Sequence, residues 1–471
     1  MIKVAKYRTE KDFLGEREVR SDCYWGIHTQ RALENFPFGK NDPGYEIVKS
    51  LALVKKACCI GNKKLGFIEQ ELADAIIAAA DEIIAGALKD QFPVTGLQGG
   101  AGTSVNMNIN EVIANRAMEI LGHNKGEYWN CHPVEHVNLH QSTNDVYPTA
   151  VKVTLITAMR ELSAAAASLQ GALQQKEKEF ASIVTIGRTE LQDAVPMTLG
   201  AQFSAYSEAI ARDRWRTFKC EERLRIVNIG GTAVGTGLTA PREYIFGVIE
   251  HLRELSGYGL TRGDNMVDQT ANIDALVEVS GILCAHAANI AKIAGDLRLL
   301  NLLKEIRLPP VQTGSSVMPG KVNPVVAEAA ISVSMKVRAN HQIVAECAAH
   351  GSLQINEFLP LAAYSLVQSS LLLIDIDRLL KDSVTAIEAC PSVCAKNLHS
   401  STSVVTAFLP AIGYSEAERL SRMFSASGRD DCVGFLKEQL GEDAVNDTLS
   451  PEKVMALGFV RKKGATNADN A

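Results

Sequence analysis

The sequence lacks an excess of positive charge: among 471 residues, 48 Lys and Arg face 54 Asp and Glu, for a net charge of −6. A protein that binds nucleic acid needs a basic surface, so nucleic acid is not an expected partner. Long uncharged apolar runs are also missing, since residues 371–374 end at Asp375, and the first residues lack the apolar region of a signal peptide. We therefore expect a soluble, cytoplasmic protein with no membrane partner.

Two further absences narrow the class of protein. The ten cysteines form no CxxC pair and lie mostly in apolar helical contexts, which fits a reducing compartment. Cys390 and Cys394 could form a redox pair, but a core thiol beside an incidental one is the favoured interpretation, because the spacing differs from the thioredoxin-type motif. No GxGxxG motif follows a strand, so a doubly wound dinucleotide-binding enzyme is disfavoured.

What the sequence contains is long helical periodicity. Between Leu155 and Leu173 the apolar residues advance by four and three positions, which predicts a helix of about 30 residues. Further long helices are expected at about 198–228, 274–303, 325–350 and 360–390. Helices of this length pack as bundles, and a dimer or tetramer would cover the remaining apolar surface.

The fold class expected from this pattern is all-α, with few strands and a central bundle of long helices. The chain is expected to comprise an N-terminal, mostly helical domain at 1–142, a long-helix bundle at 143–398 and a small C-terminal helical domain at 399–471. The last boundary follows from shorter helical patterns that are richer in Ser, Gly and Asp.

Four polar segments, three of them with glycine, interrupt the helices and are the candidate site: residues 99–104, 141–145, 187–196 and 314–324. The first two place Thr and Ser hydroxyls at helix N-termini, where free N–H groups suit a carboxylate or phosphate. Ordinary helix capping explains each of them about as well. The third is dense in charged and amide groups, and its residues alone assign it no role.

The fourth segment has the composition of a mobile loop that covers a substrate. Glycines lie at both ends, Lys321 can bind an anion, and Ser315 and Ser316 could supply a nucleophile or a base. A serine acts as a base only if its pKa is strongly lowered, which requires N–H donors and a cation around its oxygen.

Three histidines, His132, His136 and His140, recur every four residues and suggest a metal site. We expect none there, because Pro133 makes a regular helix doubtful and no carboxylate-rich surroundings are evident.

Residues 314–323 resemble the signature loop of the aspartase/fumarase superfamily. The resemblance extends over about residues 10–420, most clearly at 13–19, 91–94, 98–108, 141–145, 191–200 and 235–238, where the sequence resembles aspartase. It implies a homotetramer built on a bundle of long helices, with each site assembled from loops of three subunits. It also implies removal of an amine from a small amino-acid substrate by anti elimination, without a metal or an organic cofactor.

The resemblance also implies roles for the fourth segment. Ser315 would remove the Cβ proton, and Ser316 with nearby amides would hold the charge of the carbanion. Lys321 and Asn323 would clamp the α-carboxylate. Glu328, just after the loop, is expected to be structural.

The other segments would bind the rest of the substrate. The group on Cβ would be held by four hydroxyl-bearing residues, Thr103, Ser104, Ser142 and Thr143. Asn144 and Thr189 would face the leaving amine.

Three departures from the family pattern concern charge. Glu190 stands where aspartases have Gln or His and fumarases His; Leu139 replaces a usual Lys; and the stretch Asn356-Glu357, also expected at the substrate, carries an extra carboxylate. If Glu190 and Glu357 are ionised, the site has lost one positive charge and gained two negative ones, which disfavours a dianion.

A substrate with one carboxylate, a fixed cationic amine and an N–H donor ring fits these charges better. Ergothionases are similar to aspartase and remove trimethylamine from ergothioneine to give thiol-urocanate, so ergothioneine is the favoured substrate and L-aspartate the alternative. Glu190 would then hold the onium group or the ring; if it instead pairs with Arg188 or another Arg, an aspartase site is intact. Fumarase chemistry and a catalytically silent relative are less favoured.

Overall fold

The computed structural model describes residues 6–38 and 44–459, and the chain divides into two compact units. The first comprises residues 1–164, 213–288 and 333–375, and the second comprises residues 165–212, 289–332 and 376–471. Five long helices contribute a segment to each unit: α5 (Thr143–Glu179), α6 (Leu199–Leu224), α9 (Asp274–Leu302), α10 (Val325–Ala349) and α11 (Leu359–Thr385).

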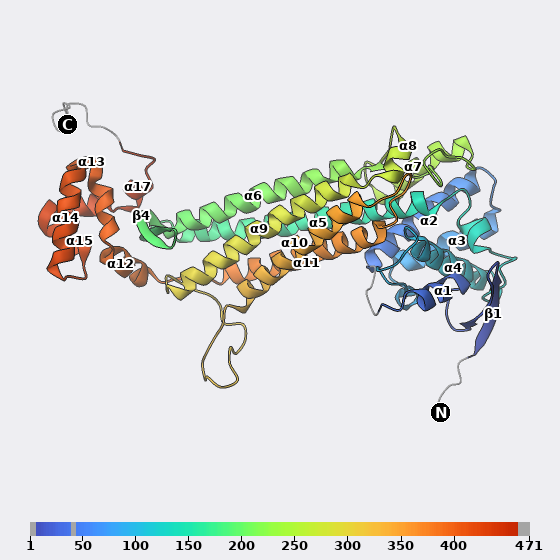
Figure 1. The fold of residues 1–471 in the computed structure, drawn as a ribbon, viewed down its shortest axis with the longest axis horizontal. Helices are drawn as coiled ribbons and strands as arrows, with labels where there is room; N and C mark the ends of the chain where they lie inside the picture. Colours follow the sequence, from blue (N-terminus) through green and yellow to red (C-terminus); the bar gives the residue numbers. More distant parts are fainter. Residues whose placement is uncertain (1–5, 39–43, 460–471) are drawn as a thin grey trace. The chain divides into compact units, whose positions relative to one another are not determined.

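In the first unit the long helices form a bundle, and polar side chains join each neighbouring pair. Arg160 of α5 binds Glu221 of α6 at 2.8 Å, and Asp213 of α6 contacts His286 of α9 at 3.1 Å. Ser280 of α9 meets His341 of α10 at 3.0 Å, and Asn340 of α10 donates to the carbonyl of Ser365 in α11 at 3.2 Å. Figure 1 shows these segments side by side. The Asp213–His286 and Asn340–Ser365 contacts are buried, and they therefore hold the helices in one register.

The rest of the first unit is built from shorter elements on the chain before and between the long helices. Helix α2 packs on α3, α4 and α7, and two of the small sheets belong here, β1–β2 antiparallel and β5–β6 parallel. The bounds are β1 (Tyr7–Asp12), β2 (Gly15–Arg20), α1 (Ile27–Asn35), α2 (Tyr45–Lys64), α3 (Gln70–Ile84), η1 (Lys89–Gln91), α4 (Thr103–Ile120), the π-helical turn η2 (Pro133–Val137), β5 (Ile226–Val227), α7 (Arg242–Ser256), β6 (Thr261–Arg262) and α8 (Met266–Ala271).

The second unit has its own apolar core around the C-terminal helices. An antiparallel hairpin of β3 (Val184–Thr189) and β4 (Gln192–Thr198) packs on them, and Ile186 of β3 is buried in that core. The other elements are β7 (Ile306–Arg307), β8 (Glu388–Ala389), α12 (Pro391–Ser400), η3 (Thr402–Phe408), α13 (Leu409–Ile412), α14 (Tyr414–Ser427), α15 (Cys432–Leu440), α16 (Glu442–Thr448) and α17 (Pro451–Val454).

These elements confirm the expected fold class and the positions of the long helices. The first of them is longer than predicted, 37 residues against about 30, and it includes Pro148. The Asn144 carbonyl, which Pro148 leaves without a helical N–H, accepts the side chain of Asn228 at 2.8 Å instead. The compact units cut across the three linear domains, whose boundaries remain a prediction about sequence segments.

Within residues 6–38 and 44–459, two helices qualify by length and composition as membrane spans, although the sequence contains no uncharged apolar run of that length. These are α9 and α11, with 44% and 67% of their most apolar windows buried. The core helices of soluble proteins pass the same test, so this is weak evidence for a membrane.

Candidate active site

Helices α4 and α5 begin next to each other, and this brings together the first two polar segments. Gly102 precedes α4 with φ of +98°, and a Cβ there would lie 2.6 Å from the ring of Tyr147 in α5. The side-chain amide of Asn106 donates to the hydroxyl of Thr143 at 3.0 Å. Glycine therefore permits the close approach, and the amide fixes it.

This junction places the four predicted hydroxyls at two adjacent helix N-termini. Thr103 and Ser104 open α4, and Ser142 and Thr143 lie at the start of α5. The positive ends of both helix dipoles lie at this junction, so it suits a carboxylate.

The start of α5 is held by the buried carboxylate of Asp145. It accepts the N–H of Ser142 at 2.9 Å and those of Gly230 and Thr232 at 3.2 and 2.9 Å. Burial raises the pKa of Asp145 to about 6, and the backbone N–H donors oppose that shift. Ser142 is thereby tied to the loop at 228–233, a role that the sequence analysis did not assign to Asp145.

Asn144 is oriented by the same loop. Its side-chain amide donates to the carbonyl of Ala233 at 2.7 Å, and Asn228 donates to its backbone carbonyl at 2.8 Å. This orientation leaves Oδ1 of Asn144 to accept a hydrogen bond, as its predicted position at a leaving amine requires.

A buried ammonium group lies beside the same segment. Lys55 of α2 is fully buried, and its Nζ donates to Asn138 at 2.8 Å and to Gln141 at 2.9 Å. Burial lowers its pKa to about 7. Leu139 lacks the cation that the family pattern usually has, and here an ammonium reaches the same stretch from another helix. A lysine inside the apolar pattern of α2 was the one sequence signal.

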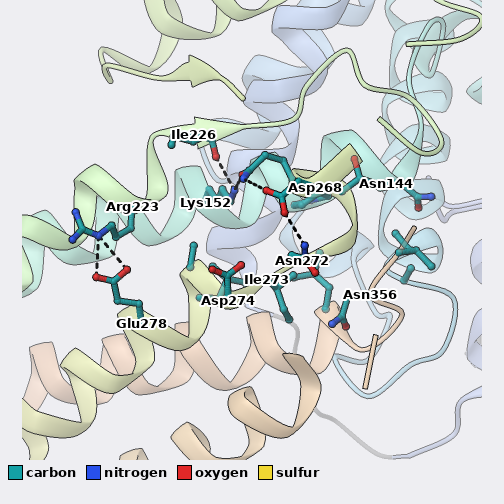
Figure 2. Close-up of a pocket in the computed structure, with 18 of the residues that line it drawn as sticks. Asn144, Lys152, Arg223, Ile226, Asp268, Asn272, Ile273, Asp274, Glu278 and Asn356 are labelled. Atoms are coloured by element: carbon teal, nitrogen blue, oxygen red, sulfur yellow. Dashed lines mark hydrogen bonds and ion pairs between the residues drawn. The ribbon is translucent and has the colours of Figure 1, made fainter. Parts of the chain in front are cut away.

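A pocket of about 380 Å³ opens beside this junction (Figure 2). Asn144 and Asn356 line it together with Lys152, one helical turn beyond Pro148 on the same face of α5. Lys152 donates to the carbonyl of Ile226 at 2.7 Å and to Gln269 at 2.9 Å, and burial lowers its pKa to about 8. The carboxylates in the lining are Glu222, Asp268, Asp274 and Glu278.

The predicted pair Asn356 and Glu357 is engaged in its own turn. Asn356 donates to the carbonyl of Cys347 at 2.8 Å and accepts the N–H of Phe358 at 3.0 Å. The carboxylate of Glu357 accepts the hydroxyl of Ser352 at 2.7 Å, and this bond lowers its pKa. Both side chains shape the connection between α10 and α11, and their contact with a substrate remains a prediction.

The third segment is the β3–β4 hairpin, and Glu190 and Leu191 form its two-residue turn. Both have left-handed backbone angles, φ of 53° and 63°, and both are exposed. Arg188 binds Asp193 at 3.3 Å and Glu305 at 2.8 Å. The alternative in which Glu190 pairs with Arg188 is therefore wrong, and no ion pair of Glu190 occurs within the described part of the chain.

The fourth segment forms a closed loop between β7 and α10. The N–H of Gly314 binds the carbonyl of Lys321 at 2.7 Å, and the Asn323 amide donates to the carbonyl of Gly314 at 2.8 Å. A Cβ at position 314 would lie 2.8 Å from that Lys321 oxygen, so glycine is required. Lys321 and Ser316 are exposed on the loop.

Ser315 has the surroundings that a serine base needs. Its Oγ accepts two backbone N–H groups, from Val317 at 3.0 Å and from Met318 at 2.9 Å. Donors aimed at the oxygen favour the alkoxide over the hydroxyl. Lys321, the cation that a serine base also requires, is exposed in the same loop, and its approach to the Ser315 oxygen remains a prediction.

The predicted site residues are divided between the two compact units. The first unit holds Thr103, Ser104, Ser142, Thr143, Asn144, Asn356 and Glu357, and the second holds Thr189, Glu190, Ser315, Ser316, Lys321 and Asn323.

The three histidines do not converge. The ring of His132 accepts the N–H groups of Val134 and Glu135, His136 accepts the N–H of His132, and His140 contacts Asn62. Across residues 6–38 and 44–459, no three His, Cys, Asp or Glu side chains gather as metal ligands would.

Known proteins resemble this chain in both sequence and fold. A family described as lyase matches residues 15–339. The aspartate ammonia-lyase of Bacillus subtilis (strain 168) is 42% identical over 467 residues, covering 97% of this chain and 98% of the relative. A solved fumarate lyase:delta crystallin from Brucella melitensis, bound to cobalt, has a TM-score of 0.90 at 42% identity, covering 95% of this chain and 99% of that one. A class II fumarase from Schistosoma mansoni has a TM-score of 0.88 at 30% identity, covering 96% and 100%.

Proposed function

This chain belongs to the aspartase/fumarase superfamily of lyases and is a carbon–nitrogen lyase, and from that premise we propose that it eliminates ammonia from L-aspartate to give fumarate. The observation that carries the proposal is the junction of α4 and α5, where two helix N-termini and four hydroxyls offer a site for the β-carboxylate. The aspartate ammonia-lyase of Bacillus subtilis (strain 168), which is 42% identical to this chain, supports the same substrate.

The chemistry requires that loops of different subunits bring these groups to one substrate. The Ser315 alkoxide takes the Cβ proton, and the electron pair of that C–H bond forms the Cα–Cβ double bond as the C–N bond breaks. Charge that develops on the substrate is held by backbone N–H groups and the Ser316 hydroxyl, while Lys321 and Asn323 bind the α-carboxylate. Asn144 and Thr189 accept hydrogen bonds from the departing amine.

Two of the three charge departures weigh less against a dianion. The Glu357 carboxylate keeps its charge but is held by Ser352 in a local turn, and the Lys55 amine, with a pKa of about 7, approaches the segment in which Leu139 lacks a cation. Only Glu190 remains as an additional carboxylate without a partner in the described residues. This balance favours L-aspartate over the ergothioneine assignment, which the sequence alone favoured.

A second candidate rests on Glu190. Its carboxylate lies at the tip of a hairpin and is not neutralised by Arg188, so it could hold the trimethylammonium group of a betaine such as ergothioneine.

We propose that the site is completed in a homotetramer by loops of three subunits. Large apolar side chains are exposed along the helices, with Trp215 at 64%, Phe218 at 62% and Leu302 at 74% exposure, which supports burial against further copies.

We also propose a cytoplasmic location. All ten cysteines are free, which is in keeping with a reducing compartment.

The test is a parallel assay of purified protein with L-aspartate, L-malate and ergothioneine. Fumarate absorbance together with ammonia release from L-aspartate supports the proposal. Trimethylamine and thiol-urocanate from ergothioneine, without turnover of L-aspartate, would establish the second candidate instead. Turnover of L-malate alone would contradict both.

A further inference from the structure

The β3–β4 hairpin presents Thr189 and Glu190 on a turn that its own residues do not favour. A two-residue turn with both residues in the left-handed region is the type I′ arrangement, which Asn and Gly adopt readily. Here the positions are held by Glu190 and Leu191, at φ of 53° and 63°. Other contacts must therefore hold the turn.

Those contacts converge on Arg188. It lies directly opposite Asp193 in the hairpin register, and the two side chains form an ion pair across the strands. Its other arm reaches Glu305, just before β7, at 2.8 Å. The guanidinium therefore ties both strands to a separate segment of the same unit, which a single ammonium could not do with the same geometry.

Glu305 is itself held in place by burial and by hydrogen bonds. Its carboxylate is fully buried, and one oxygen accepts both Arg188 and the side chain of Asn397 at 2.8 Å. Its backbone carbonyl accepts the N–H of Cys390 at 2.8 Å. The second carboxylate oxygen is buried without a partner, so Arg188 is the cation that offsets a costly buried charge.

We propose that Glu305 is a positioning residue. It acts through Arg188 to hold Thr189 and the adjacent Glu190–Leu191 turn in the conformation required for the reaction. The inference rests on the proposed function for its kinetic consequence, because Thr189 and Glu190 would face the amine end of the substrate. Thr189 and Glu190 touch the substrate in this scheme, whereas Glu305 does not.

The test compares Glu305→Gln, which removes the charge but keeps the shape, with Glu388→Gln. Glu388 pairs with Arg307 on the adjacent β7–β8 ladder, and the two side chains are 69% and 70% exposed. We expect Glu305→Gln to lower kcat by about tenfold to a hundredfold with KM changed less than about twofold, because the turn would be displaced during the chemical step. The control should match the wild type.

Rescue separates positioning from a general structural role. Leu191→Gly supplies the residue that a type I′ turn prefers, and in the Glu305→Gln background it should restore most of the lost kcat. Amide hydrogen exchange at residues 189–192 should be faster in Glu305→Gln and slower again in the double variant. Wild-type kcat and exchange in Glu305→Gln would overturn the inference, as would a loss that Leu191→Gly leaves unchanged.

Two provisions keep the test decisive. If Glu305→Gln does not fold, Arg188→Lys keeps a cation but loses the fork that reaches both Asp193 and Glu305, and unchanged kcat and exchange in that variant would overturn the inference. Hydrogen exchange needs no substrate, so an enzyme inactive on every amino acid would count against the proposed function alone.

Discussion

Replacing Gly102 by alanine tests the junction on which the substrate assignment depends. The added Cβ would lie 2.6, 2.8 and 2.9 Å from three ring carbons of Tyr147, closer than real Cβ contacts. The left-handed φ of +98° adds a cost of about 1–2 kcal/mol, and forced overpacking adds about 1–3 kcal/mol. We expect Gly102→Ala to destabilise the protein by roughly 2–5 kcal/mol.

Gly122, just beyond the other end of α4, provides the matched control. It has φ of +81°, but a Cβ there would meet nothing within 4 Å. Gly122→Ala should therefore cost only the backbone term, about 1–2 kcal/mol. The difference between the two variants isolates the contact between α4 and α5.

Urea unfolding measures both costs, and the KM for L-aspartate measures the functional effect. Displacement of the α4 N-terminus from α5 should raise KM several-fold in Gly102→Ala and leave it unchanged in Gly122→Ala. Equal destabilisation with equal KM values would refute the argument that this close approach builds the carboxylate site.

The remaining predictions concern the reacting groups and one buried ion pair. Ser315→Ala should abolish turnover while gel filtration shows an unchanged assembly; retained turnover would remove Ser315 as the base. Lys321→Met should raise the KM of any α-carboxylate substrate at least tenfold, and an unchanged KM would place the clamp elsewhere. Glu190→Gln should improve KM for L-aspartate and impair any cationic substrate; the reverse pattern would contradict its proposed role. Hydrogen bonds from Arg160 lower the pKa of Glu221 to about 2, so its stabilising contribution is full above about pH 4.5 and is lost as pH falls through 2. Unfolding of Glu221→Gln should therefore show a flatter acid dependence, by about 1–2 kcal/mol because both arginine partners are half exposed, and an unaltered curve would show that the pair contributes nothing.

The long helices could be predicted because their signal is local. Apolar residues at spacings of three and four recur over many turns, and the strongest seam, from Leu155 to Leu173, lies within α5. The loop at 314–323 could be predicted as chemical because its residue types, two serines and a lysine between glycines, are rare together in a connector.

The sequence also indicated the four polar segments, but not which of their charged groups are held by other residues. Glu190 and Glu357 are the same residue type in the sequence, but their surroundings differ. Ser352 donates a hydrogen bond to Glu357, whereas Glu190 lies on an exposed turn. The Lys55 ammonium approaches Gln141 from a helix far away in the chain. Electrostatic balance depends on distance through space, which a residue pattern does not contain.

By itself, then, the sequence determined the helical architecture and the family, because periodicity and short motifs depend on neighbouring residues, and it predicts which groups react. Only the tertiary structure decided which helix ends meet, which carboxylates are already bound, and that Ser315 lies among N–H donors. Those facts arise from contacts between residues tens to hundreds of positions apart, where packing and burial set the energies.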